Sequence, residues 1–180
     1  TYSVYAITDD YRRTPVVEGI RDTEYTLQAV APGDQDFVQY CVFAYTNEGE
    51  SDGTMTPLLA VGTPYEGLWE SFAGGDMSYI FGTDGEDSAY WDIYPDQSML
   101  ASQDGDNGFA ALSGKYTGES ADLISGKISL AGMTNPALTF WVYTVADDDS
   151  NILEIYINEA GGEPVLAKKN VSNQGATGWN

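Results

Sequence analysis

Hydrophobic and polar residues alternate with a period of two along most of the chain. This alternation runs through residues 2–7, 25–30 and 38–45, and it is typical of strands that bury one face. Turn-forming residues separate the runs, as in the Pro-Gly pair at 32–33 and the glycine-containing stretch 47–53. No convincing stretch of ten or more residues has the spacing of an amphipathic helix. The pattern therefore predicts an all-β protein built as a sandwich or a barrel.

The second half of the chain continues the strand pattern. Residues 138–145 carry large apolar side chains on both faces, which is typical of a strand that is covered on both sides. Residues 151–158 alternate, and we expect Leu153, Ile155 and Ile157 to face inward. The acidic turn between these two segments is expected to join them as a hairpin.

A change in strand spacing at residues 61–64, where a glycine and a proline occur, indicates a domain boundary. We place an N-terminal domain at residues 1–63 and a C-terminal domain at 64–180. The chain starts inside a strand-like alternation, so we expect both domains to be trimmed and to belong with other domains of one longer chain. A trimmed sandwich would expose an apolar sheet face for a partner to cover.

In the N-terminal domain, the alternating positions of residues 40–51 (YCVFAYTNEGES) lead to an Ala, an Asn and a Gly-x-Ser turn. This segment resembles the F strand of a fibronectin type III domain and the turn that follows it. The resemblance assigns strands C, C′, E and G to residues 2–5, 14–20, 25–30 and 55–62. Two features depart from the family: Val38 stands where the tyrosine corner normally falls, and strands A and B would precede Thr1.

Five segments of the C-terminal domain carry a recognisable order of sequence signals: residues 69–72, 90–93, 105–112, 121–130 and 135–141. In this order they resemble the jelly-roll domains of the cleaved-adhesin, MAM and choice-of-anchor J group, which occur in bacterial surface and secreted proteins such as the gingipain adhesins. Gly126 departs from the family, which usually has a proline there, and the final strands would follow residue 180. The resemblance implies a galactose-binding or MAM-like β-sandwich.

The net charge of the chain restricts the classes of molecule that it can bind. Its 180 residues include 28 acidic and 7 basic side chains, which gives a net charge of −21, and no basic residue lies between Asp22 and Lys115. Such a surface repels phosphate backbones and anionic lipid headgroups. No apolar run approaches the roughly 18 residues of a spanning helix. We therefore expect no nucleic-acid partner and no membrane insertion.

The composition also argues against catalysis. Histidine is absent and Cys41 is the single cysteine, which excludes Ser-His-Asp and Cys-His mechanisms, histidine-bound zinc and an internal disulfide. Paired carboxylates could hydrolyse a glycoside, but a chain with this many acids forms too many formal pairs to single one out. No nucleophile elbow or phosphate-binding glycine loop is present. We expect no catalytic residue, and Cys41 as a small apolar filler.

Acidic residues gather most densely at 84–87 and 104–108. Calcium takes six to eight oxygen ligands and suits such turns, although the spacing is not that of an EF-hand. The jelly-roll resemblance implies a structural calcium held between an acid on the first strand and the second turn. It points to Glu70, Asp104, Asp106 and Asn107 as ligands. Solvated loop acids are the alternative, which we favour for the turn at 147–149.

Aromatic side chains offer a binding surface, because flat rings stack on the apolar faces of sugars. Trp91, with its polar neighbours Asp92 and Tyr94, is the candidate ligand-binding set, and packing in a core is the alternative. The sequence thus predicts a non-catalytic, calcium-stabilised binding or adhesion module of a secreted or cell-surface bacterial protein, whose partner is a host protein or glycan. The alternatives are an accessory module of a larger secreted protease or glycoside hydrolase, and a structural spacer.

Overall fold

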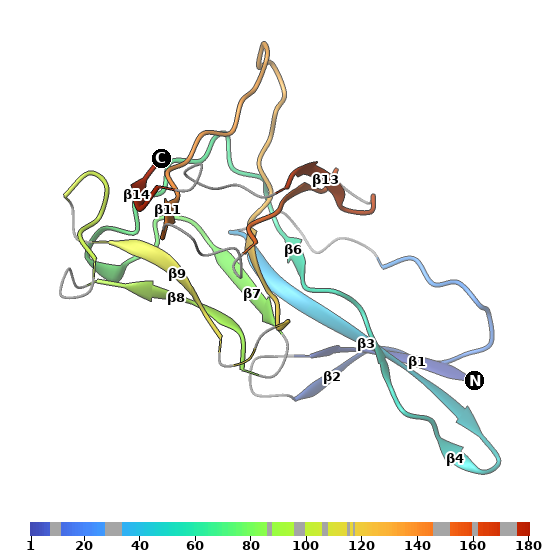
Figure 1. The fold of residues 1–180 in the computed structure, drawn as a ribbon. Coiled ribbons are helices and arrows are strands. Elements are labelled where there is room, and N and C mark those ends of the chain that lie inside the picture. The colour runs from blue at the N-terminus through green and yellow to red at the C-terminus, as the bar shows by residue number, and fades with distance from the viewer. Residues whose placement is uncertain are drawn as a thin grey trace.

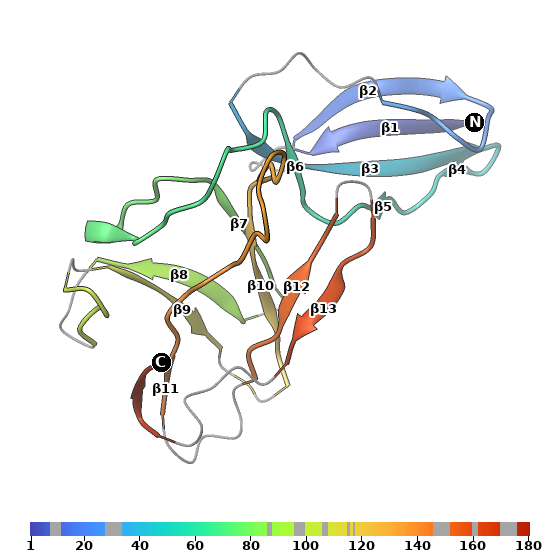
Figure 2. The same cartoon turned by 90° about the horizontal axis from the view of Figure 1, so that it is seen from above.

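Antiparallel strands make up the fold in the computed structural model (Figures 1 and 2). In the part of the chain that it describes, the single helical element is a 3₁₀ turn, η1 (Ala73–Gly75). The all-β class predicted from the alternation is confirmed. The described residues are 1–7, 12–27, 34–85, 88–95, 100–105, 108–114, 116, 118–145, 152–159, 162–169 and 176–180.

The largest sheet belongs to the N-terminal part of the chain. β1 lies between β2 and β3, while β4, β5 and β6 all pair with β3. The predicted strands at 2–7, 14–20 and 38–45 are confirmed, whereas residues 25–27 belong to no strand and the segment 55–62 is divided in two. The strands are β1 (Tyr2–Ile7), β2 (Arg13–Ile20), β3 (Asp36–Thr46), β4 (Gly49–Glu50), β5 (Thr54–Met55) and β6 (Leu59–Val61).

The core of this sheet lies on the face that carries Cys41 and Phe43, each only 4% exposed. The edge of the Tyr5 ring packs on Phe43, with ring centroids 5.7 Å apart. The Arg13 guanidinium covers the same ring at 4.0 Å from its centroid, which is a cation–π contact. Gly53 closes the face from the side, because a Cβ atom at this position would collide with both core side chains. Cys41 is the small apolar filler that the sequence predicts.

A chain of polar contacts crosses the same sheet. The Tyr5 hydroxyl donates to Glu18 Oε1 at 2.6 Å and lies 3.3 Å from the Tyr45 hydroxyl. Tyr45 in turn donates to Glu50 Oε2 at 2.6 Å, and Arg13 Nη1 donates to Glu50 Oε1 at 2.9 Å. The bonds from Tyr45 and then Arg13 lower the pKa of Glu50, and the bond to Glu50 raises the pKa of Tyr45. The contacts tie β1, β2, β3 and β4 together.

The lowered pKa of Glu50 predicts how acid affects stability. A carboxyl group whose folded-state pKa lies below its unfolded value stabilises the protein above the unfolded pKa, and this contribution disappears as the pH falls through the folded pKa. Between about pH 6 and about pH 3, the melting temperature of the parent should fall further than that of Glu50→Gln, measured by circular dichroism. Glu24→Gln, which changes an exposed acid, should follow the parent. Equal slopes for parent and Glu50→Gln would contradict the prediction.

The C-terminal part forms four two-stranded sheets in the described residues. Figures 1 and 2 show the N-terminal sheet on one side and β8–β9 on the other, with β7 and β10 between them. Strands β8, β9 and β10 overlap the segments matched to the jelly-roll domains. The pairs are β7 (Phe81–Gly85) with β10 (Ala121–Ser125), β8 (Tyr90–Tyr94) with β9 (Phe109–Ser113), β11 (Tyr143–Thr144) with β14 (Gly178–Trp179), and β12 (Ile155–Ile157) with β13 (Val165–Lys168).

The hairpin predicted from residues 138–145 and 151–158 is wrong. The first segment contributes only β11, which pairs with β14, and the second contributes β12, which pairs with β13. Residues 138–141 belong to no strand, and Leu138 and Trp141 are exposed. The acidic turn at 147–149 lies outside the described residues. Alternation reports strand propensity, whereas the choice of partner depends on distant segments.

The side chain of Gln35 joins the two parts of the chain. Its amide behaves like a strand residue: Nε2 donates to the Lys127 carbonyl at 2.9 Å, and Oε1 accepts from the Lys127 N–H at 2.6 Å. Gln35 is 7% exposed. Beside it, the N–H of Tyr65 donates to the Lys127 carbonyl at 2.9 Å and the N–H of Ser129 donates to the Tyr65 carbonyl at 2.7 Å. Both polar groups of this buried amide are therefore satisfied by one residue of the C-terminal part.

Apolar contacts cross the same junction. Leu58 and Phe37 occupy the space beside Gly82 of β7, where a Cβ atom would meet both side chains. The predicted domain boundary after residue 63 stays a prediction, and the contacts of Gln35, Phe37 and Leu58 span it.

Removing the Gln35 amide should weaken the fold. Gln35→Ala leaves the N–H of Lys127 without its acceptor in a half-buried place, which should lower the free energy of unfolding by about 1–3 kcal/mol in urea titrations. Gln39→Ala is the matched control, since Gln39 Nε2 makes a single long bond of 3.4 Å to the Thr56 carbonyl. The prediction fails if both variants lose the same stability.

The fold exposes a large surface for its size. Its accessible area is 13179 Å², whereas a compact monomer of 19.5 kDa exposes about 8,500 Å². In the described part, the buried apolar side chains are those of Val4, Cys41, Phe43 and Ala89. Large apolar side chains such as Trp69 and Trp141 are exposed instead. No described helix has the length and apolar character needed to span a membrane.

Candidate functional site

The loop between β6 and β7 presents the most exposed large apolar side chain of the described residues. Trp69 is 81% exposed, and Met77, on the same loop, is 47% exposed. Residues 69–72, matched to a first strand at the sequence level, form no strand and lead into η1. Burial of the apolar surface of this indole against another molecule would be favourable.

The carboxylate of Glu70 holds this loop in place. Its Oε1 accepts the N–H of Phe72 at 2.8 Å, and its Oε2 accepts the N–H groups of Ser78 and Tyr79 at 2.7 and 3.1 Å. Charge-assisted bonds of this kind are stronger than neutral ones. One side chain thus ties the middle of the loop to its end. Sequence reasoning missed this role, because the partners are main-chain groups that leave no residue-type signal.

The loop is also anchored to the sheets below it. Phe72 has a φ of 58°, a left-handed conformation that is rare outside glycine, and its ring packs on Phe81 of β7 with centroids 5.5 Å apart. Gly75, with a φ of 84°, lies against Pro95. Gly108 lies against the Phe72 carbonyl so closely that a side chain at 108 would not fit. Trp69 is therefore presented from an ordered loop.

The predicted calcium ligands are placed only in part. Both Glu70 oxygens accept loop N–H groups, which accounts for this carboxylate without an ion. Asp104 is exposed, while Asp106 and Asn107 lie outside the described residues. Within the described ranges, no group of three or more acidic or cysteine side chains is arranged to hold a metal. Calcium binding at these four residues stays a prediction.

The predicted ligand-binding residues Trp91, Asp92 and Tyr94 all lie on β8 but do not form one surface. Side chains alternate along a strand, so Trp91 points away from the face that carries the other two. The Trp91 Nε1–H donates to the Ala121 carbonyl of β10 at 2.8 Å, which is a structural contact. Asp92 Oδ1 accepts the N–H of Ile93 at 2.9 Å. The ligand-binding role of the three residues stays a prediction, and the structure separates Trp91 from the pair.

Tyr94 belongs to a cluster of half-buried aromatic rings instead. It stacks on Phe109 with centroids 5.6 Å apart, Phe109 meets Trp179 edge to face at 6.5 Å, and Trp179 meets Tyr143 at 5.5 Å. The Trp179 Nε1–H donates to the Ala101 carbonyl at 2.9 Å. The cluster packs β11 and β14 against β8 and β9.

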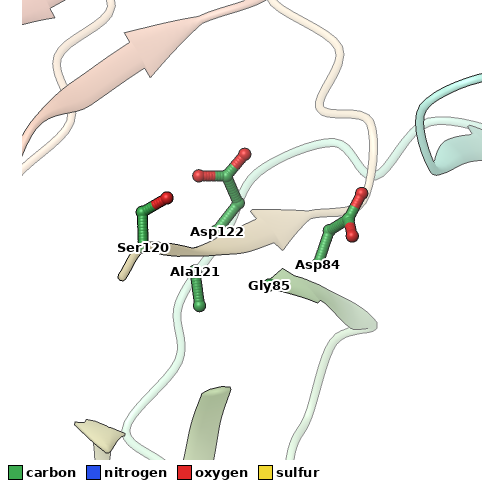
Figure 3. Close-up of a pocket in the computed structure, with 5 residues that line it drawn as sticks. All are labelled: Asp84, Gly85, Ser120, Ala121 and Asp122. Atoms are coloured by element: carbon green, nitrogen blue, oxygen red, sulfur yellow. The ribbon is translucent and has the colours of Figure 1, made fainter. Parts of the chain in front are cut away.

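An acidic pocket of about 230 Å³ lies on the β7–β10 pair, as Figure 3 shows. Asp84 and Asp122 are directly opposite in the register, and their carboxylates lie on the same face as the Ser120 hydroxyl (Figure 3). Like charges in directly opposite positions destabilise a sheet. The sequence did not reveal this pair, because the two acids are far apart in the chain and only the strand register brings them together.

Neutralising one acid of this pair should stabilise the protein. Asp122→Asn removes the repulsion across the strands and should raise the free energy of unfolding by up to about 1 kcal/mol in urea. Asp92→Asn makes the same change of charge on β8, where Ala111 is the opposite residue, and should leave stability nearly unchanged. The gain of Asp122→Asn should shrink in high salt, which screens exposed charges. Equal effects of the two variants would contradict the assignment.

Comparison with known proteins adds no relative: no family model, no curated protein and no solved structure matches this chain.

Proposed function

We propose that this chain is a non-catalytic binding module of a secreted or cell-surface protein, and that it binds its partner through the Trp69 loop. The exposure of Trp69 is the observation that carries the proposal. Tryptophan is the side chain most enriched at the energetic centres of protein interfaces, and its flat ring also stacks on sugars. Either a host protein or a glycan could therefore take the role of partner.

The rigidity of the loop supports the same function. Binding costs less conformational entropy when the contacting side chain is already held in place. The bonds of Glu70 and the packing of Phe72 hold the loop before any partner arrives. An adhesin and an accessory module of a larger secreted enzyme would both use this surface. The other domains of the longer chain would decide between the two roles, because only the second role requires a catalytic domain among them.

The proposal predicts that one tryptophan dominates binding. The parent protein, screened on a glycan array and on immobilised extracellular host proteins, should give a specific hit, and Trp69→Ala should weaken that hit by about tenfold or more. Trp141→Ala is the matched control, because this tryptophan is also exposed, at 58%, but lies outside the loop. No hit for the parent, or equal losses in the two variants, would overturn the proposal.

A second variant separates the direct contact of Trp69 with the partner from the rigidity that Glu70 gives to the loop. Glu70→Ala leaves the indole in place but removes the acceptor for three loop N–H groups, so the amides of Phe72, Ser78 and Tyr79 should exchange faster with deuterium. Binding should weaken less than in Trp69→Ala. Unchanged exchange at these amides would contradict the role of Glu70.

A further inference from the structure

The tip of the β12–β13 hairpin carries an apolar groove with an acidic rim. Ile157 and Val165 are directly opposite in the register, so their side chains share one face. They are 57% and 66% exposed. A groove of about 440 Å³ is lined by these two residues together with Glu159, Gly162 and Glu163. The N–H of Gly162 donates to the Glu159 carbonyl at 2.7 Å, which holds these two lining residues together.

Charge is distributed unevenly along this hairpin. At its base, Lys169 Nζ lies 2.7 Å from Glu154 Oε1, and the Tyr156 hydroxyl donates to Glu154 Oε2 at 2.7 Å. At its tip, neither Glu159 nor Glu163 forms an ion pair with a described residue. The base of the hairpin therefore has its own counter-charge, whereas the tip is apolar and negative.

In the described residues, no further strand pairs with this hairpin. In the described part of the chain, β12 and β13 pair only with each other, and Figure 2 shows them as a separate two-stranded ribbon. An isolated two-stranded hairpin is marginally stable in water. Its free edges offer main-chain groups to which an extended segment can add as a further strand.

We infer that this groove binds an extended, cationic segment of a partner protein, in which a lysine or arginine alternates with apolar residues. The inference rests on the proposed binding function and names the chemistry of a partner. The aliphatic stem of the basic side chain would pack on Ile157 and Val165, while its charged end would lie between Glu159 and Glu163. Charge complementarity of this kind also speeds association.

The charge and the lining residues of the groove favour a cationic strand over a second copy of the chain or a sugar. A second copy of the chain would bring another net charge of −21 to an acidic rim, and the two would repel. A sugar ring would find no aromatic side chain among the lining residues. A cationic strand could pack its apolar atoms on Ile157 and Val165 and place its positive charge beside the carboxylates of Glu159 and Glu163.

Peptide binding tests the inference. The probe is a fluorescein-labelled peptide of about eight residues in which valine and lysine alternate, followed by fluorescence anisotropy at low salt. We expect it to bind about tenfold tighter than the same peptide with glutamate in place of lysine. The Glu159→Gln/Glu163→Gln variant should bind it about tenfold more weakly than the parent, and Val165→Thr about threefold more weakly.

Matched controls distinguish the groove from general attraction to an acidic protein. The Glu24→Gln/Glu48→Gln variant has the same change of charge on exposed acids of the N-terminal part and should bind the peptide like the parent. Equal weakening in the two double variants, or no binding by the parent, would overturn the inference.

The same assay separates this inference from the proposed function. Trp69→Ala should bind the lysine peptide like the parent. A parent that fails to bind the peptide but keeps a hit that depends on Trp69 would refute the groove alone. A hit of the parent that Trp69→Ala leaves unchanged, together with peptide binding at the hairpin, would refute the role of the Trp69 loop alone.

Discussion

The pairing of the Gln35 amide with the main chain of Lys127 is the contact on which the arrangement of the chain depends. Where the structure describes it, the C-terminal part forms two-stranded sheets, none of which is large enough to be stable alone. Gln35 fixes the segment that follows β10 against the six-stranded sheet. Two further hydrogen bonds connect neighbouring strands to this segment. The N–H of Gly126 donates to the Ile80 carbonyl just before β7, and the Trp91 indole of β8 donates to the Ala121 carbonyl of β10. Tyr65, which lies on the same loop as Trp69, donates to the Lys127 carbonyl and so joins this loop directly to the junction.

Local features of the sequence were sufficient to predict the N-terminal strands. β1 and β3 show clear alternation, whereas β2 was predicted from a family resemblance. Alternation identifies strands but not their pairing, since β1 pairs with β3 between residues as distant in the chain as Tyr2 and Ala44. The pattern was insufficient at residues 138–145, where strong strand propensity meets a partner at residues 178–179 that alternation cannot identify. The same limit applies to the site. Composition drew attention to Trp91, Asp92 and Tyr94, but only the pleat of β8 shows that they face in different directions.

Negative charge has a different effect at each place where the fold concentrates it. In the N-terminal sheet, Glu50 is paired with Arg13 and accepts from Tyr45, so its charge stabilises the sheet. On β7 and β10, the facing carboxylates of Asp84 and Asp122 oppose each other. At the hairpin tip, Glu159 and Glu163 lie beside apolar side chains and form no ion pair with a described residue. The fold thus uses one kind of side chain for cohesion, for local repulsion and for a surface that suits a cation.

The exposed segment 138–142, which reads LTFWV, has a consequence for the behaviour of the protein in solution. It has high strand propensity, no charge and no proline, and its residues 138–141 join no strand. Segments of this composition can stack between molecules as cross-β assemblies. The net charge of −21 opposes that contact, because it keeps molecules apart before the segments can meet. The negative charge of the chain therefore prevents its molecules from associating through this segment. This repulsion would vanish near the isoelectric point of about 4.1.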